Sequence, residues 1–212
     1  MGLEAVVAGE GIESLVGTMR GVRVLAGIAS TGLVAASLVM GAPASARDVI
    51  NGTDGRDHLR GTAFSDTIRG FGGDDSVYAL AGADLIFGGS GGDVVVAGRG
   101  DDTVYGGTQG DSLYGGRGAD TSYGGHGGDY IQGNAGSDVL FGVWDPDVIS
   151  DGAGGDRIYA GQRNDTIFLG EDGTPDKVHC GSGHDVVWGA TSENTVAADC
   201  EEVHVNPTPP GP

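Results

Sequence analysis

Residues 88–141 read GGSGGDVVV AGRGDDTVY GGTQGDSLY GGRGADTSY GGHGGDYIQ GNAGSDVLF, and this stretch decides the fold of the chain. Each block is nine residues long, opens on small residues and carries Asp at position six. Position eight is aliphatic in five of the six blocks. A disordered low-complexity segment does not keep such a register, so the period predicts a repeat fold.

The nine-residue period extends outward from this stretch without a gap, from Gly52 to Phe168, and makes thirteen blocks. Position eight is Ile, Leu or Val in all of them except the block with Ser122. After a two-residue insertion, Asp176 and Asp185 continue the pattern more loosely. Position six is Asp in every block: Asp57, Asp66, Asp75, Asp84, Asp93, Asp102, Asp111, Asp120, Asp129, Asp138, Asp147, Asp156 and Asp165.

The composition excludes several classes of protein. Gly accounts for 44 of 212 residues, and 30 acidic residues against 11 basic ones give a net charge of −19. Nucleic acid is excluded as a partner, because binding phosphate requires a basic surface. High charge and abundant Gly are also typical of disorder, but the strict period argues against that interpretation.

The repeat pattern predicts stacked coils with two rows of carboxylates. Gly in the first positions permits positive φ and lets carbonyls turn inward, while positions seven to nine predict a short strand whose aliphatic residue faces in. Two blocks make one coil, and neighbouring coils stack about 4.8 Å apart. Alternate Asp residues of the period therefore line up on opposite sides of the stack.

Calcium is the ion that this arrangement favours. Rows of carboxylates repel one another, and a divalent cation between successive Asp residues removes the repulsion. Hard oxygen ligands suit Ca²⁺, whereas Mg²⁺ demands tight octahedral geometry. Zn²⁺ prefers Cys or His, and the blocks hold only His58 and His126. Sites are expected to be weaker where position four is not Gly, at Phe64, Gln109, Asp145 and Arg163.

The blocks resemble the RTX, or hemolysin-type, calcium-binding repeat G-G-x-G-x-D-x-U-x, in which U is a large aliphatic residue. The resemblance covers more than half of the chain. It implies an all-β, right-handed parallel β-roll with Ca²⁺ ions held by the repeat Asp residues between neighbouring turns. Because the core has one aliphatic residue in nine, we expect metal binding to supply much of the folding energy.

The N-terminal segment is typical of a secretory leader. Arg20 and Arg23 precede the uncharged stretch 24–41, and Ala44-Ser45-Ala46 follows it. This order of a basic flank, an apolar stretch and an A-x-A site predicts a Sec-type signal peptide that is cleaved before Arg47. The alternative is a membrane-spanning helix, because the apolar stretch is nearly long enough to cross a bilayer. No later segment is long and apolar enough to span a bilayer, so the mature chain is expected to be secreted and extracellular.

These patterns divide the chain into five parts. We expect Met19 to be an alternative start of translation. A secretory leader ordinarily begins with its basic flank, whereas residues 1–18 precede that flank. The expected parts are a signal peptide at 1–46, an N-terminal lead-in at 47–51, the calcium-binding β-roll at 52–189, a C-terminal cap at 190–205 and a disordered Pro-rich tail at 206–212.

Cys180 and Cys200 are the only cysteines. In an exported chain an even number of cysteines favours a disulfide, which would join the last coil to the following segment and cover the open end of the roll. Both cysteines lie in an ending, D-x-V-x-C…D-C-E-x-V, that resembles that of exported actinobacterial repeat proteins. The alternative is a zinc site, since His184 and His204 each follow a cysteine at the same spacing.

Position nine of alternate blocks carries an aromatic ladder: Phe87, Tyr105, Tyr123, Phe141 and Tyr159. The ladder either stacks on itself and stabilises the sheet, or offers a surface adhesin a platform for a glycan or protein. We expect no catalysis. The G-x-S-x-G sequence at 88–92 lies in a repeat turn, without the strand–turn–helix context of a nucleophile.

Overall fold

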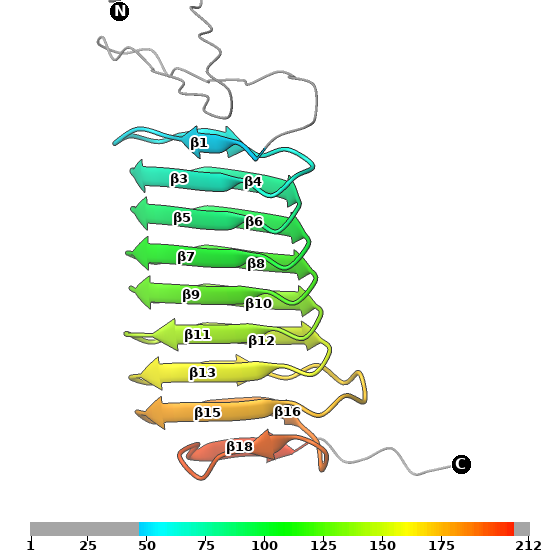
Figure 1. The fold of residues 1–212 in the computed structure, drawn as a ribbon. Coiled ribbons are helices and arrows are strands. Elements are labelled where there is room, and N and C mark those ends of the chain that lie inside the picture. The colour runs from blue at the N-terminus through cyan, green and yellow to red at the C-terminus, as the bar shows by residue number, and fades with distance from the viewer. Residues whose placement is uncertain (1–46, 206–212) are drawn as a thin grey trace, which may run out of the picture.

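The computed structural model describes residues 47–205 as a stack of coils built from 18 β-strands (Figure 1). The strands form two parallel sheets of nine strands each, in which every strand pairs with those two places away in the chain. No helix occurs within residues 47–205. The predicted all-β parallel solenoid, with two nonapeptide blocks in each coil, is therefore confirmed.

The first sheet contains the odd-numbered strands: β1 (Val49–Asn51), β3 (Thr67–Gly72), β5 (Leu85–Ser90), β7 (Thr103–Thr108), β9 (Thr121–His126), β11 (Val139–Val143), β13 (Arg157–Gln162), β15 (Lys177–Ser182) and β17 (Thr195–Val196). The second sheet contains the even-numbered ones: β2 (His58–Arg60), β4 (Ser76–Ala81), β6 (Val94–Arg99), β8 (Ser112–Arg117), β10 (Tyr130–Ala135), β12 (Val148–Ala153), β14 (Thr166–Phe168), β16 (Val186–Ala190) and β18 (Glu202–Val205).

Most strands are longer than the segment predicted from positions seven to nine. Strand β7, for example, continues through Gly106 into the first three positions of the next block. Positions eight and one are both buried and alternate with outward-facing positions, as the pleat of a strand requires. The turn of each block is therefore confined to positions four to six.

The core is a narrow column between the two sheets. The aliphatic residues at position eight are fully buried along most of the stack, and Ser122 is buried among them. At position one the inward-facing residues are Gly or Ala in every block except that of Asp151, and Ala79, Ala97 and Ala160 are fully buried. One large side chain per strand therefore supplies most of the apolar contact.

The register between neighbouring coils follows the sequence period. Val104 pairs with Ser122, its equivalent two blocks later, whereas Arg157 pairs with Lys177, which the insertion moves two positions further along the chain. The two inserted residues lie in the loop between β14 and β15, which projects from the stack (Figure 1). Residues 49–51, expected as a lead-in, form β1 and pair with β3 in the same register.

The C-terminal end of the stack is closed by β17 and β18, which pair with β15 and β16. Cys180 and Cys200 form the predicted disulfide, with their Cα atoms 5.1 Å apart. Because both sulfur atoms are part of this disulfide, neither is available as a thiolate ligand, and the alternative zinc site with His184 and His204 is wrong.

The proposed signal peptide and the Pro-rich tail lie outside the described residues. Within residues 47–205, no helix has the length and apolar character needed to cross a membrane.

Candidate metal centre

The repeat Asp residues form two continuous rows, as the period predicted. In each row, Oδ1 of one Asp accepts a hydrogen bond from the backbone N–H of the Asp one coil earlier. Asp93 donates in this way to Asp111, and Asp111 donates to Asp129, both at 2.8 Å. The first row contains Asp57, Asp75, Asp93, Asp111, Asp129, Asp147, Asp165 and Asp185.

The second row contains Asp66, Asp84, Asp102, Asp120, Asp138, Asp156 and Asp176, and begins with the backbone N–H of Asp48. Sequence reasoning left Asp176 and Asp185 outside the set of metal ligands. In the hydrogen bonds of these two residues, donor and acceptor are two residues further apart in the sequence than in the regular coils, because the inserted loop lengthens that coil. The D-x-V pattern that follows the insertion was the signal for both.

The second carboxylate oxygen, Oδ2, lacks a hydrogen-bond partner along most of both rows. A buried carboxylate oxygen without a partner is costly, so a row of such oxygens fits the binding of cations. The residues with a buried, unpartnered Oδ2 are Asp75, Asp84, Asp93, Asp102, Asp111, Asp120, Asp129, Asp138, Asp147, Asp156, Asp165 and Asp185.

Position one lies directly beside these oxygen atoms. A Cβ added at Gly106 would lie 2.5 Å from Oδ2 of Asp111 and 2.7 Å from the carbonyl oxygen of Gly124. Oxygen atoms from two neighbouring coils thus converge where a side chain would otherwise project. The donors are carboxylate and carbonyl oxygens, a set that suits Ca²⁺.

Burial away from water raises the pKa of the row carboxylates from Asp75 and Asp84 onward, and neighbouring carboxylates add to the effect in the middle of each row. The pKa rises most for Asp111 and Asp147, to about 8. The pKa rises to about 7 for Asp102, Asp138 and Asp165, and to about 6 for Asp75, Asp84, Asp120, Asp129 and Asp156. Without a cation, therefore, ionising these groups opposes folding.

The comparison with known families agrees with this geometry. The sequence model of the RTX calcium-binding nonapeptide repeat matches the chain four times, over residues 51–86, 87–122, 123–149 and 141–173. The chain belongs to this family. Its RTX repeats bind several Ca²⁺ ions. A search among curated proteins finds no match to the chain.

The first turn of each RTX row differs from the turns that follow. Thr53 donates to Oδ2 of Asp57 through both its backbone N–H, at 2.6 Å, and its hydroxyl, at 2.8 Å. Thr62 does the same for Asp66, at 2.6 and 3.0 Å. Neither Asp therefore has an unpartnered Oδ2. Sequence reasoning missed these two threonines, although Thr at position two marks only the first two blocks.

Three of the four irregular RTX turns keep the backbone of the regular ones. Gln109, Asp145 and Arg163 have positive φ, as most glycines at position four do. The Asp residues of these turns also have an unpartnered Oδ2, like those of regular turns. Phe64 is not among the described residues with positive φ, and its turn is the one that Thr62 closes.

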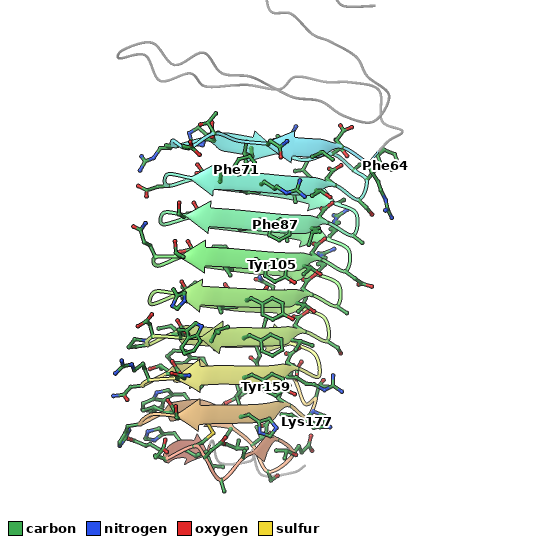
Figure 2. All side chains as sticks on the ribbon, turned by 60° about the vertical axis from the view of Figure 1, so that its left-hand side comes forward. Phe64, Phe71, Phe87, Tyr105, Tyr159 and Lys177 are labelled. Carbon is green, nitrogen blue, oxygen red and sulfur yellow. A yellow bond between two sulfur atoms is a disulfide. The ribbon has the colours of Figure 1, made fainter. Side chains whose placement is uncertain are left out.

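The aromatic ladder is a continuous stack on the outer face of the first sheet, where Figure 2 shows Phe87, Tyr105 and Tyr159 along one line. Successive ring centroids lie 4.6 to 5.1 Å apart, with the ring planes within 10° of parallel. His179 stacks on Tyr159 at one end, and the guanidinium of Arg69 lies 5.6 Å from the Phe87 ring at the other.

Proposed function

We propose that this RTX protein is an exported, non-catalytic calcium-binding protein in which Ca²⁺ binding drives folding of the β-roll. The thirteen repeat Asp residues, together with Asp176 and Asp185, would hold the ions with backbone carbonyls of neighbouring coils. The bound cations would neutralise carboxylates that the fold places in buried rows. Asp57 and Asp66, whose Oδ2 atoms bond to threonines, would contribute least.

One observation carries this proposal: twelve buried Oδ2 atoms have no partner, and they follow the period of the stack. Within the described chain the ion pairs are Arg56 with Asp74 and His204 with Glu202, and neither involves a row carboxylate. No basic side chain among residues 47–205 is therefore paired with the rows. A cation from solution is the remaining counter-charge.

Circular dichroism of the mature chain tests the coupling of calcium to folding. We expect a largely unstructured spectrum in chelator and a β-rich spectrum in millimolar Ca²⁺, because the apolar core is thin and the carboxylates repel. The same measurement in millimolar Mg²⁺ is the control for a general effect of divalent charge. A complete β spectrum in chelator would contradict the proposal.

Export rests on the leader sequence, on the disulfide and on the family, whose members are typically extracellular. N-terminal sequencing of the protein recovered outside the cell tests it, with Arg47 as the expected first residue. Recovery with residues 24–41 still attached, in the membrane fraction, would contradict it.

The alternative function is recognition of a glycan or protein by the aromatic ladder. A sugar stacks on the face of an aromatic ring, but inside the ladder each ring face is covered by its neighbour at about stacking distance. The edges of the rings remain for contact with a partner. The geometry therefore favours a stabilising role for the ladder within the calcium-binding roll.

A further inference from the structure

Asp151 breaks the pattern of the repeat at a position that faces the carboxylate rows. It occupies position one of its block, where the other twelve blocks have Gly or Ala. It lies in β12, and the residue is 1% exposed. Because a side chain at position one projects toward Oδ2 of the repeat Asp, a carboxylate here reaches the space that other turns leave to backbone oxygens.

The structure brings Asp151 together with two carboxylates of the second row, Asp156 and Asp176. All three are buried, and a ligand oxygen of each lies within 4.8 Å of those of the other two. Calcium binds its oxygen ligands at about 2.3–2.6 Å, so two ligands on opposite sides of one ion lie up to about 5 Å apart. A single Ca²⁺ can therefore contact all three residues.

Hydrogen bonds from several parts of the chain orient these carboxylates. Oδ1 of Asp151 accepts from the N–H of Gly170 at 2.8 Å, in the inserted loop. Oδ1 of Asp176 accepts from the N–H of Asp156 at 3.0 Å, and its Oδ2 accepts from Nδ2 of Asn194 at 2.6 Å. The cluster thus joins a regular coil, the inserted loop and the C-terminal segment.

One oxygen of the cluster has no donor at all. Oδ2 of Asp156 is buried without a hydrogen-bond partner, on a residue that is 1% exposed. Neither of the ion pairs found within residues 47–205 reaches the three carboxylates. Three buried carboxylates without a basic partner require a bound cation or the loss of their charge.

We propose that Asp151, Asp156 and Asp176 form one Ca²⁺ site that binds more tightly than the repeat turns do. This inference rests on the proposed calcium-binding function. At the other turns of the array the buried carboxylates are those of the two rows, whereas this site adds a third buried one from position one. Calcium affinity rises with the number of charged ligands and with the rigidity of the site. The ion held here would fasten the inserted loop and Asn194 to the last regular coil.

A calcium-buffered titration of the mature chain that counts bound ions tests the proposal. In the unchanged protein, we expect one Ca²⁺ per chain to bind at a free concentration about tenfold lower than the others. Asp151→Asn, which preserves shape and removes the charge, should abolish this tight class and leave the remaining ions. Asp151→Gly, which restores the residue of the regular repeat, should do the same. Glu193→Gln, which removes one exposed charge near the C-terminal end, is the control and should retain it.

The outcomes separate this proposal from the general function. If Asp151→Asn binds with the same curve as the unchanged protein, or if no tight class exists, the three-carboxylate site is wrong although the rows still bind calcium. If the unchanged protein binds no calcium, the proposed function itself fails. Should the Asn variant not fold, the Gly variant decides; failure of both to fold in saturating Ca²⁺ would give Asp151 a structural role and overturn the proposal.

Discussion

The two oxygens of each repeat Asp are used differently. Oδ1 links successive coils by accepting a backbone hydrogen bond, while Oδ2 of most row residues has no hydrogen-bond partner and is the atom that we propose binds the cation. In this proposal the Asp side chain serves both the stack and the ion. Thr53 and Thr62 supply hydrogen bonds to Oδ2 at the first turn of each row.

Replacing a central Asp should damage calcium binding more than replacing the first one. Asp111 lies between Asp93 and Asp129 and would contribute to two ion sites, whereas Oδ2 of Asp57 is already bonded to Thr53. We expect Asp111→Ala to raise the calcium concentration at the folding midpoint about tenfold or more, and Asp57→Ala to raise it less. Calcium titrations followed by circular dichroism measure both.

Asp93→Ala is the control for the irregular turn of Asp111, because the turn of Asp93 has Gly at position four. It should behave like Asp111→Ala, since Gln109 retains the positive φ of the regular turns. Equal effects of Asp57→Ala and the two central changes would contradict the shared-ligand interpretation.

Ser122 places a polar side chain in the apolar core and lowers its stability. Its side chain is fully buried, its Oγ has no hydrogen-bond partner, and it pairs with Val104 and Leu140 in the neighbouring strands. Ser122→Val should increase the free energy of unfolding by about 1–3 kcal/mol, because it removes an unsatisfied hydroxyl and buries more apolar surface.

Thermal unfolding in excess Ca²⁺ measures the effect of Ser122→Val. Thr121→Val, at the neighbouring outward-facing position, is the control and should change stability little. A lower melting temperature for Ser122→Val would show that the site cannot accommodate the larger side chain.

At the scale of the element, each strand presents its residues alternately to the core and to its outer face. In the first sheet the outward position nine carries the aromatic ladder, whose rings stack at the spacing of the strands. In the second sheet the corresponding residues are mixed, for example Tyr78, Val96 and Tyr114. The ladder is therefore a property of one face.

Removing a ring from the middle of the ladder should destabilise the stack. Tyr123 contacts the rings of both Tyr105 and Phe141, and each stacked pair contributes about 0.5–1.5 kcal/mol. Tyr123→Ala should thus lower the free energy of unfolding by about 1–3 kcal/mol more than Tyr78→Ala. Tyr78 is the matched control, because it occupies position nine on the other sheet and is 48% exposed.

Denaturant unfolding in excess Ca²⁺ measures the stability of both tyrosine variants. Equal losses would mean that the ring stacking of the ladder adds nothing to stability, and would strengthen the recognition function.

At the scale of the whole molecule, the two buried rows make stability depend on pH and calcium together. In the unfolded chain an Asp has a pKa of 3.8, whereas in the folded chain without calcium burial raises the pKa of ten row carboxylates to values from about 6 to about 8. The folded state binds more protons over this window, so its stability falls as pH rises through it. Calcium competes with these protons and reverses the loss at high pH.

We therefore expect the calcium-free protein to have more β structure at about pH 5.5 than at about pH 8. Circular dichroism of calcium-stripped protein across this range measures it, and the same series in excess Ca²⁺ should remain β-rich throughout. Association of chains increases as the pH approaches the isoelectric point of about 4.2, and it could be mistaken for folding. Sedimentation at each pH is the control that detects it. Equal or greater β content at the high-pH end without calcium would contradict the raised pKa values.

The sequence by itself determined the repeat architecture, the two rows of Asp residues and the aromatic ladder. The physical reason is that each coil of a solenoid contacts only its neighbours, so that a constant period places equivalent residues of successive coils next to each other. The choice of calcium followed as well, because every repeat offers the same hard oxygen ligands.

Only the tertiary structure decided the features that depend on atoms from different coils. It showed that most strands extend into the first three positions of the next block, with position one facing inward. It joined Cys180 to Cys200, bonded Asp57 to Thr53, and retained positive φ at Gln109 despite its side chain. It also brought Asp151 beside Asp156 and Asp176, although the inserted loop lies between Asp151 and Asp176 in the chain and breaks the period there. A period predicts contacts where it holds, and where it is interrupted the packing of the coils alone sets which side chains meet.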